Sequence, residues 1–181
     1  GAIAAMDAGG EGARLLRVAG ALLDQARGAL DADHALLGFV KHPDEGSPVV
    51  MVFSGATAGL RLTTFEQSSP ERACLGEELV ARARGFGRPL MLPEVQAQRL
   101  VPAPVVGAPW RGVLAVPSDP ERSGDDGPVL LLYWDAPRIL HPQEGRYVDG
   151  LQRALEREVR RDRAAIRQAR RHDVAVAAMQ D

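Results

Sequence analysis

Two apolar segments near the middle of the chain show the clearest hydrophobic pattern. Residues 110–117 have the sequence WRGVLAVP and residues 127–135 have the sequence GPVLLLYWD. Short runs of Val, Leu, Trp and Tyr bounded by Pro, Gly and Asp are typical of buried strands. The connecting segment Ser118–Gly127 is polar and glycine-rich, so we expect a surface loop. The pattern therefore predicts an antiparallel pair at the centre of a sheet.

The residues before this pair predict a helix followed by a hairpin. In residues 14–30, apolar side chains recur at helical spacing and predict an amphipathic helix with one buried face. These side chains are Leu15, Leu16, Ala19, Leu22, Leu23, Ala26 and Leu30. Residues 34–40 and 49–53 flank a turn-forming sequence, His42–Gly46, and predict an antiparallel hairpin. Residues 1–13 are mostly small, and we expect a flexible terminus.

The following region contains weaker signals. Ser54–Ala73 lacks a sustained period, which favours a long loop acting as a lid or binding loop. One face of a short helix is indicated by Leu75, Leu79, Ala83 and Phe86, and Gly85 and Gly87 are expected to end that helix. The proline-bracketed segment Pro89–Pro93 predicts an edge strand.

A long helix is predicted at the C-terminal end. Leu140–Glu144 resembles a helix start with Pro142 at the first helical position, and no proline follows. The apolar positions follow a drifting heptad: Val148, Leu151, Leu155, Val159, Ile166, Ala169 and Val176. A solitary helix would expose Leu151, Leu155 and Ile166 to water, so the spacing predicts a parallel homodimer.

Composition and charge narrow the class of protein. The 181 residues suit one domain and an extension, and no apolar run approaches the roughly 20 residues of a membrane span. A single cysteine and no signal-peptide pattern favour a reducing cytoplasm. The net charge is −2, and although eight arginines fall within residues 153–171, they alternate with Glu156, Glu158 and Asp162. A solvated helix surface is therefore favoured over contact with nucleic acid.

Four segments together resemble the GAF domain over about residues 15–158. They are Gly76–Val80 continuing to Arg88–Leu90, then Val113–Pro117, Pro128–Leu132 and Leu140–Glu144. The resemblance implies an α+β fold, with an antiparallel sheet flanked by helices and a long C-terminal signalling helix. It also implies a sensory domain over residues 14–158, with residues 159–181 as a helical linker towards an output domain.

A ligand pocket between sheet and loop is one interpretation of several apolar residues, with simple core packing as the other. The candidates are Phe53, Phe65, Cys74, Met91 and Trp110. Cys74 lies about where bilin-binding GAF domains attach their chromophore, but Leu75 replaces the family's His, so a small buried side chain is favoured. The cyclic-nucleotide pattern of the family is absent, and one cysteine is too few for methionine sulfoxide reduction.

No catalytic residue, metal site or cofactor is predicted. The histidines His34, His42, His141 and His172 do not fall at metal-ligand spacing, and no Gly-rich phosphate loop or activated nucleophile is present. We therefore expect no enzymatic activity in this chain, and neither haem nor bilin.

The last residues resemble two kinds of output connection. Arg171–Asp181 is similar to the helix before PPM-type serine phosphatase domains, with Val174, Ala178, Met179 and Gln180 matching it. The same segment resembles a histidine-kinase dimerisation helix in which His172 would accept the phosphoryl group. The hypothesis is a cytoplasmic sensor relaying through a dimeric helix to a phosphatase, preferred, or a kinase. The alternatives are a dimerisation or scaffolding module without a ligand, and the regulatory domain of a transcription factor.

Overall fold

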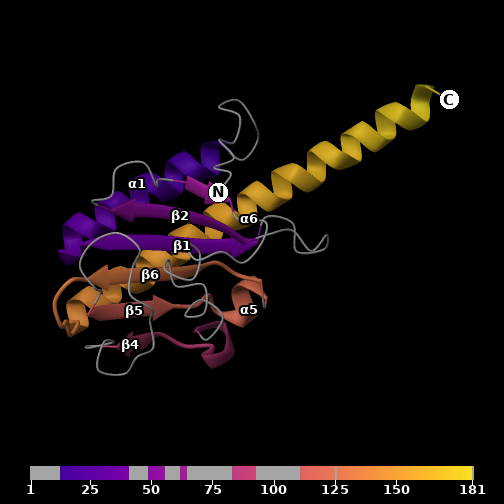
Figure 1. The fold of residues 1–181 in the computed structure, drawn as a ribbon. Coiled ribbons are helices and arrows are strands. Elements are labelled where there is room, and N and C mark those ends of the chain that lie inside the picture. The colour runs from indigo at the N-terminus through magenta and orange to yellow at the C-terminus, as the bar shows by residue number, and fades with distance from the viewer. Residues whose placement is uncertain are drawn as a thin grey trace.

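A computed structural model describes residues 13–40, 49–55, 62–64, 83–92, 111–124 and 126–180. Within them, one antiparallel sheet lies against two long helices (Figure 1). The sheet order is β3-β2-β1-β6-β5-β4. The strands are β1 (His34–Val40), β2 (Val49–Gly55), β3 (Leu62–Thr64), β4 (Leu90–Leu92), β5 (Gly112–Val116) and β6 (Val129–Trp134). The predicted α+β class is confirmed.

The predicted central strand pair is present. β5 and β6 are antiparallel, with Gly112 opposite Trp134 and Val116 opposite Leu130. β6 also pairs with β1, so these two strands form the middle of the sheet. Every residue of β5 and β6 is buried, which accounts for their unbroken apolar sequences.

The connection between β5 and β6 differs from the expected surface loop. It contains a helical turn, α5 (Pro120–Ser123), in which the Asp119 carboxylate accepts the Glu121 N–H. Ser118 is only 7% exposed, because its hydroxyl donates to the carbonyl oxygen of Pro128. The prediction was therefore wrong at Ser118, where a hydrogen bond compensates the burial of a polar group, whereas residues 120–122, Gly124 and Asp126 are exposed as expected.

The hairpin of β1 and β2 is confirmed, with His34 opposite Gly55 and Val40 opposite Val49. The expected turn His42–Gly46 lies outside the described residues. The expected loop Ser54–Ala73 was partly wrong: its first two residues belong to β2, and its residues 62–64 form β3. β3 satisfies its backbone groups by pairing with β2. Its three residues alone carry no local signal that predicts this strand. β4 lies at the opposite edge, as predicted.

The short helix before β4 is described only at its end. Residues 83–86 are helical, and Ala83 is buried as expected, but Phe86 is 56% exposed rather than part of the buried face. The helix ends at Gly87, whose φ is +65°, and not at Gly85. The Gly87 N–H donates to the carbonyl oxygens of Ala83 and Arg84, so the last turn closes there.

The first predicted helix is α1 (Ala13–Leu30). Its buried residues are Leu15, Ala19, Leu23, Ala26 and Leu30, while Leu16 and Leu22 are partly buried against the core. α1 ends at Asp31, which has a φ of 51°, and the Ala32 N–H donates to the Arg27 carbonyl oxygen at 3.0 Å. This is the hydrogen bond of a Schellman motif, with Asp31 where glycine is usual.

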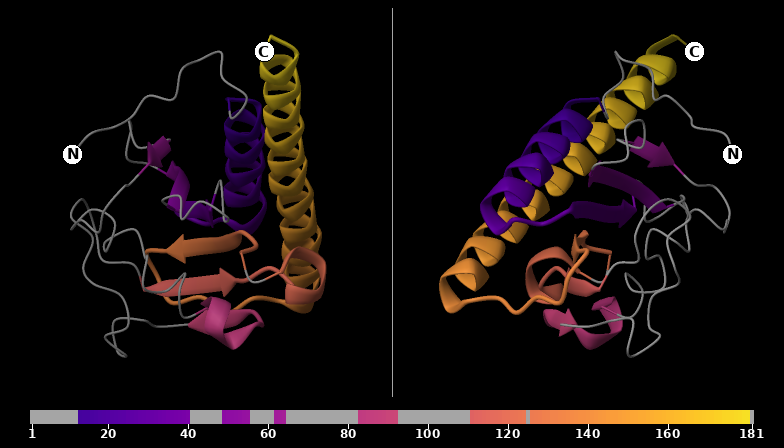
Figure 2. Two further views of the ribbon diagram at one scale, coloured as in Figure 1. Left: turned by 90° about the vertical axis from the view of Figure 1, so that its right-hand side faces the viewer. Right: turned by 60° about the vertical axis from the view of Figure 1, so that its left-hand side comes forward.

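The second long helix is α6 (Pro142–Gln180), a single helix of 39 residues that begins as predicted. The His141 N–H donates to Glu144 Oε1 at 3.0 Å, which satisfies a backbone donor at the helix start. α6 lies beside α1, and its C-terminal end extends past the body of the domain (Figures 1 and 2). No helix among the described residues is long and apolar enough to cross a membrane.

The apolar seam of α6 is covered by its own chain as far as Ile166. Leu151 is 6% exposed, Leu155 0% and Ile166 6%, although the sequence argument for a dimer required all three to face water. The core includes Val148, Leu151, Leu155 and Val159 together with residues of α1 and the sheet. That argument was wrong, because a drifting heptad has the same spacing as the core-facing stripe of a globular helix.

Candidate functional site

Gln152 of α6 joins the helix to the connection between β5 and β6. Its side chain is buried, and the two hydrogens of its Nε2 are shared among Val116 O at 3.1 Å, Ser118 Oγ at 3.2 Å and Pro128 O at 2.9 Å. These acceptors lie at the end of β5 and immediately before β6. One helical side chain therefore holds both ends of this connection against α6.

Glu156 makes a second attachment one turn later. Its Oε2 accepts from Arg122 Nε at 3.0 Å and its Oε1 from Arg122 Nη2 at 3.2 Å. The Asp119 N–H lies 3.4 Å from the same Oε1, and Arg122 Nη1 donates to Asp119 Oδ2 at 3.0 Å. A planar guanidinium matches both oxygens of a carboxylate. The buried charge of Glu156 is therefore compensated from α5.

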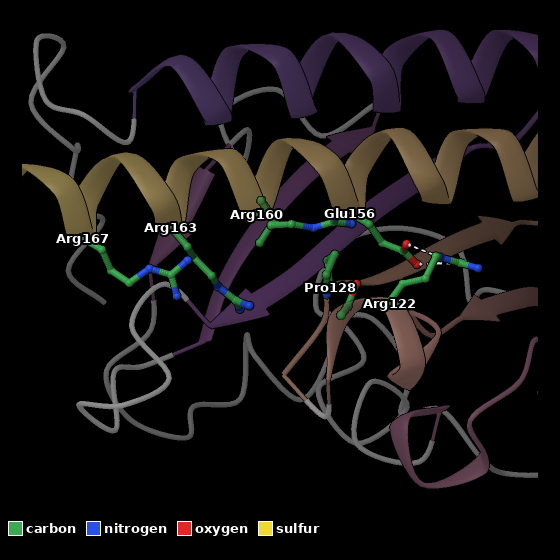
Figure 3. Close-up of a pocket in the computed structure, with 8 residues that line it drawn as sticks. Arg122, Pro128, Glu156, Arg160, Arg163 and Arg167 are labelled. Atoms are coloured by element: carbon green, nitrogen blue, oxygen red, sulfur yellow. Dashed lines mark hydrogen bonds and ion pairs between the residues drawn. The ribbon is translucent and has the colours of Figure 1, made fainter.

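Next to this ion pair is a cavity of about 170 Å³ that we call the arginine cleft (Figure 3). Its lining residues are Arg122, Ser123, Pro128, Glu156, Val159, Arg160, Arg163 and Arg167. Figure 3 shows Arg163 and Arg167 leaving α6 on the side of Pro128. The cleft carries four guanidinium groups and one carboxylate, so its charge is strongly positive.

Arg163 is fixed in this cleft by backbone carbonyl groups. Its Nε donates to Val40 O at 3.1 Å, and its Nη2 donates to Asp126 O at 2.7 Å. Burial lowers the pKa of Arg163; Asp126 and Asp162 oppose this, while the cations Arg84 and Arg167 add to it. Carbonyl oxygens orient a guanidinium without neutralising it.

Arg84 lies on the same side of the domain. Its Nη2 donates to Gly127 O at 3.2 Å, and burial lowers its pKa, with Asp126 acting in the opposite direction. Arg84 and Arg163 therefore both hold the residues before β6 through backbone carbonyls. Burial is the main cause of both lowered pKa values, so the fold keeps these two guanidinium groups partly out of water at a cost in solvation.

A third set of contacts joins α1, β6 and α6 at the other end of α6. The Leu30 carbonyl oxygen accepts from Trp134 Nε1 at 3.2 Å and from Arg138 Nη2 at 3.3 Å. Arg138 also pairs with Glu144 in the first turn of α6, and its guanidinium lies 5.7 Å from the Trp134 ring centroid. The end of α1 and the beginning of α6 are thereby connected through β6.

The predicted ligand residues are only partly described. Met91 lies in β4 opposite Leu114 and is partly buried against the core. Phe53 lies in β2 opposite Leu36, but its side chain is outside the described part of the structure. Phe65, Cys74 and Trp110 also lie outside it. The pocket between sheet and loop stays a prediction.

The arginine cleft was missed in the sequence. The sequence predicts a solvated helix face for Arg160, Arg163 and Arg167, whereas Arg163 is half-buried and hydrogen-bonded to the body. The available signal was their spacing of three and four residues, which places them on one side of a helix. Among the described residues, no three His, Cys, Asp or Glu side chains are grouped to hold a metal.

Comparison with known proteins identifies the fold. No protein-family model and no curated protein sequence matches the chain. Among solved structures, the GAF domain of the Acinetobacter phosphoenolpyruvate-protein phosphotransferase has a TM-score of 0.61 at 13% identity, covering 83% of this chain and 91% of that one. The chain has the GAF-domain fold.

Two other proteins with this architecture show that the GAF fold has different uses. The PixJ GAF domain of Thermosynechococcus elongatus, solved in a blue-light-absorbing form, has a TM-score of 0.50 at 15% identity, with 98% of both chains covered. The free methionine-R-sulfoxide reductase of Neisseria meningitidis has a TM-score of 0.55 at 17% identity, covering 83% of this chain and 81% of that one. The GAF fold by itself therefore does not decide between sensing and catalysis.

Proposed function

We propose that this GAF-fold domain is a cytoplasmic sensory or regulatory module that relays a signal along α6 to an effector domain. The observation that carries the proposal is the continuity of α6. Its first part packs in the core as far as Ile166, while almost all side chains after Ile166 are exposed (Figure 1). A rigid helix anchored in this way transmits a shift of the body to its free end.

The contacts of α6 support the same function. Gln152, Glu156 and Arg163 attach it to the residues that connect β5 with β6. A ligand that moved this connection would also move α6. The input would be a small molecule held at the arginine cleft, or in the predicted pocket of Phe53, Phe65, Cys74, Met91 and Trp110. No catalytic role is proposed for the chain.

The output would be a homodimer formed by the free end of α6. Ala165, Ala169, His172, Val176 and Met179 alternate at four and three residues, the spacing of a two-stranded coiled coil. Met179 is 82% exposed, so these positions are available to a second copy of the chain, whereas Leu151 and Leu155 are buried in the domain. A change in the rotation of α6 would then alter how two effector domains meet.

The effector would be a PPM-type serine phosphatase or a histidine kinase. The support is the sequence resemblance of Arg171–Asp181 to the helix before PPM-type phosphatase domains, in which Met179 and Gln180 match that helix. In the kinase alternative, His172 is the phosphoryl acceptor, and it is exposed on α6. Full-length protein should hydrolyse phosphoserine with a bound metal, and ATP-dependent labelling lost in His172→Ala would show the kinase instead.

Light scattering tests the relay helix. The chain of residues 1–181 should be a dimer, and a chain ending at Gln168 should be a folded monomer, because the cut spares the buried residues up to Ile166. His172→Leu should tighten the dimer and His172→Lys should weaken it, since a coiled-coil seam favours Leu and repels paired cations. A shortened chain that remains dimeric would place the interface elsewhere, with α1 the next candidate.

A further inference from the structure

The arginine cleft has the chemistry of an anion site. We propose that it binds the phosphoryl group of a small molecule between Arg160, Arg163 and Arg167, beside the Arg122–Glu156 ion pair. The regulatory meaning of such binding rests on the proposed sensory function, whereas the binding itself does not.

Charge is the first argument. The one carboxylate of the cleft, Glu156, is already occupied by two donors of Arg122. Among the described residues, ion pairs with carboxylates are formed by Arg14, Arg122, Arg138 and Arg161. Asp126 and Asp162 only partly offset the charge of Arg163, whose pKa is lowered. A bound anion would relieve the repulsion among the cations of the cleft.

Preorganisation is the second argument. Arg163 is held by the carbonyl oxygens of Val40 and Asp126, which fixes its guanidinium before any ligand arrives. Arg160 lies three residues before it and Arg167 four after, and all three line the cleft. In Figure 3 the Arg160 side chain runs along α6 towards Glu156. Guanidinium groups donate in pairs to phosphate oxygens, and a fixed group loses less entropy on binding.

The surroundings favour a small anion over nucleic acid. A second hollow that also includes Arg122 is lined by Asp119 and Asp149 as well as Arg88 and Arg153. A nucleic-acid backbone following α6 would meet these acids, while a single phosphoryl group in the cleft would not. The cavity of about 170 Å³ has room for such a group.

Calorimetric titration with pyrophosphate and with inorganic phosphate, at low salt, tests the proposal. Pyrophosphate should bind saturably at one site per chain. Arg160→Gln/Arg167→Gln should weaken this binding by roughly tenfold or more, because two charge-assisted donors are lost. The matched control is Arg146→Gln/Arg157→Gln, which removes the same charge from exposed positions of α6 and should change affinity by less than roughly twofold.

Three results would overturn the proposal: no saturable heat with either anion, equal weakening by the two double variants, or tight binding of a DNA duplex that pyrophosphate does not displace. The last would assign the arginines to a nucleic-acid surface. Light scattering with and without pyrophosphate separates this inference from the proposed function. Binding without any effect on self-association would leave the site standing and count against its coupling to the relay.

Discussion

Glu156 of α6 and Arg122 of α5, which are 34 residues apart in the sequence, form a bidentate ion pair with N–O distances of 3.0 and 3.2 Å. The Glu156 side chain is 1% exposed and that of Arg122 41% exposed. The buried member thus depends on the more exposed one for its charge compensation.

Arg122→Met should therefore lower the free energy of unfolding, because it leaves the Glu156 carboxylate buried without its partner. Arg122→Met/Glu156→Leu should recover much of the loss, since apolar side chains replace a buried pair at little cost. Urea denaturation of Arg122→Met, Glu156→Leu and the double variant completes the cycle. Equal stability of Arg122→Met and the wild type would show that the pair contributes nothing.

Replacing Gly127 and Gly150 with alanine should change the stability of the fold in opposite directions. A Cβ at Gly127 would lie 2.4 Å from Ser118 Cβ, in the contacts around Gln152, so Gly127→Ala should destabilise the fold by about 1–3 kcal/mol. Gly150 is exposed inside α6 with nothing within 4 Å, so Gly150→Ala should stabilise the fold by about 1 kcal/mol. Thermal unfolding of both variants tests the pair; a stabilising Gly127→Ala would contradict the close contact.

Asp31→Gly should raise stability by about 1 kcal/mol. Asp31 has a φ of 51°, which costs a side chain energy that glycine avoids, and its charge lies at the C-terminal end of α1. Asp31→Ala is the control, because it removes the charge and keeps the Cβ. If both variants gain equally in chemical denaturation, the charge rather than the backbone is responsible.

His34 should make stability depend on pH. Burial lowers the pKa of His34 from its usual 6.5; Asp135 and Asp33 oppose this, and Arg27 adds to it. Above this usual value neither state is protonated, and as the pH falls below it the unfolded chain takes up the proton first. Stability should therefore fall as the pH drops below about 6.5, and His34→Gln should reduce that slope. An unchanged slope in the variant would assign the dependence to other groups.

Most of the regular elements could be predicted because their signals are local. The stripe of α1, the apolar runs of β5 and β6 and the cap at Pro142 each require only neighbouring residues. β3 was not predictable, because its three residues become a strand only by pairing with β2. The surface that covers the apolar seam of α6 could not be predicted either. Leu151 and Leu155 have the same spacing whether they pack against a partner or against the same chain.

The candidate site was less predictable than the fold. Arg163 lies 123 residues from the carbonyl group of Val40 that it binds, and Arg122 lies 34 residues from Glu156. Such contacts depend on how the elements pack, so no local sequence pattern predicts them. Only the one-sided spacing of the arginines on α6 was visible in the sequence, and it is equally typical of a solvated face.

The outer strands of the sheet disfavour edge-to-edge association between copies of the domain. Within the described residues, β3 and β4, which lie at the two edges, comprise three residues each, whereas β1 and β2 have seven. Short edge strands offer few unpaired backbone groups to a strand from another molecule. Pro89, directly before β4, has no N–H to donate there. Polymerisation edge to edge into fibrils is thereby disfavoured, and ordered association is left to the helices.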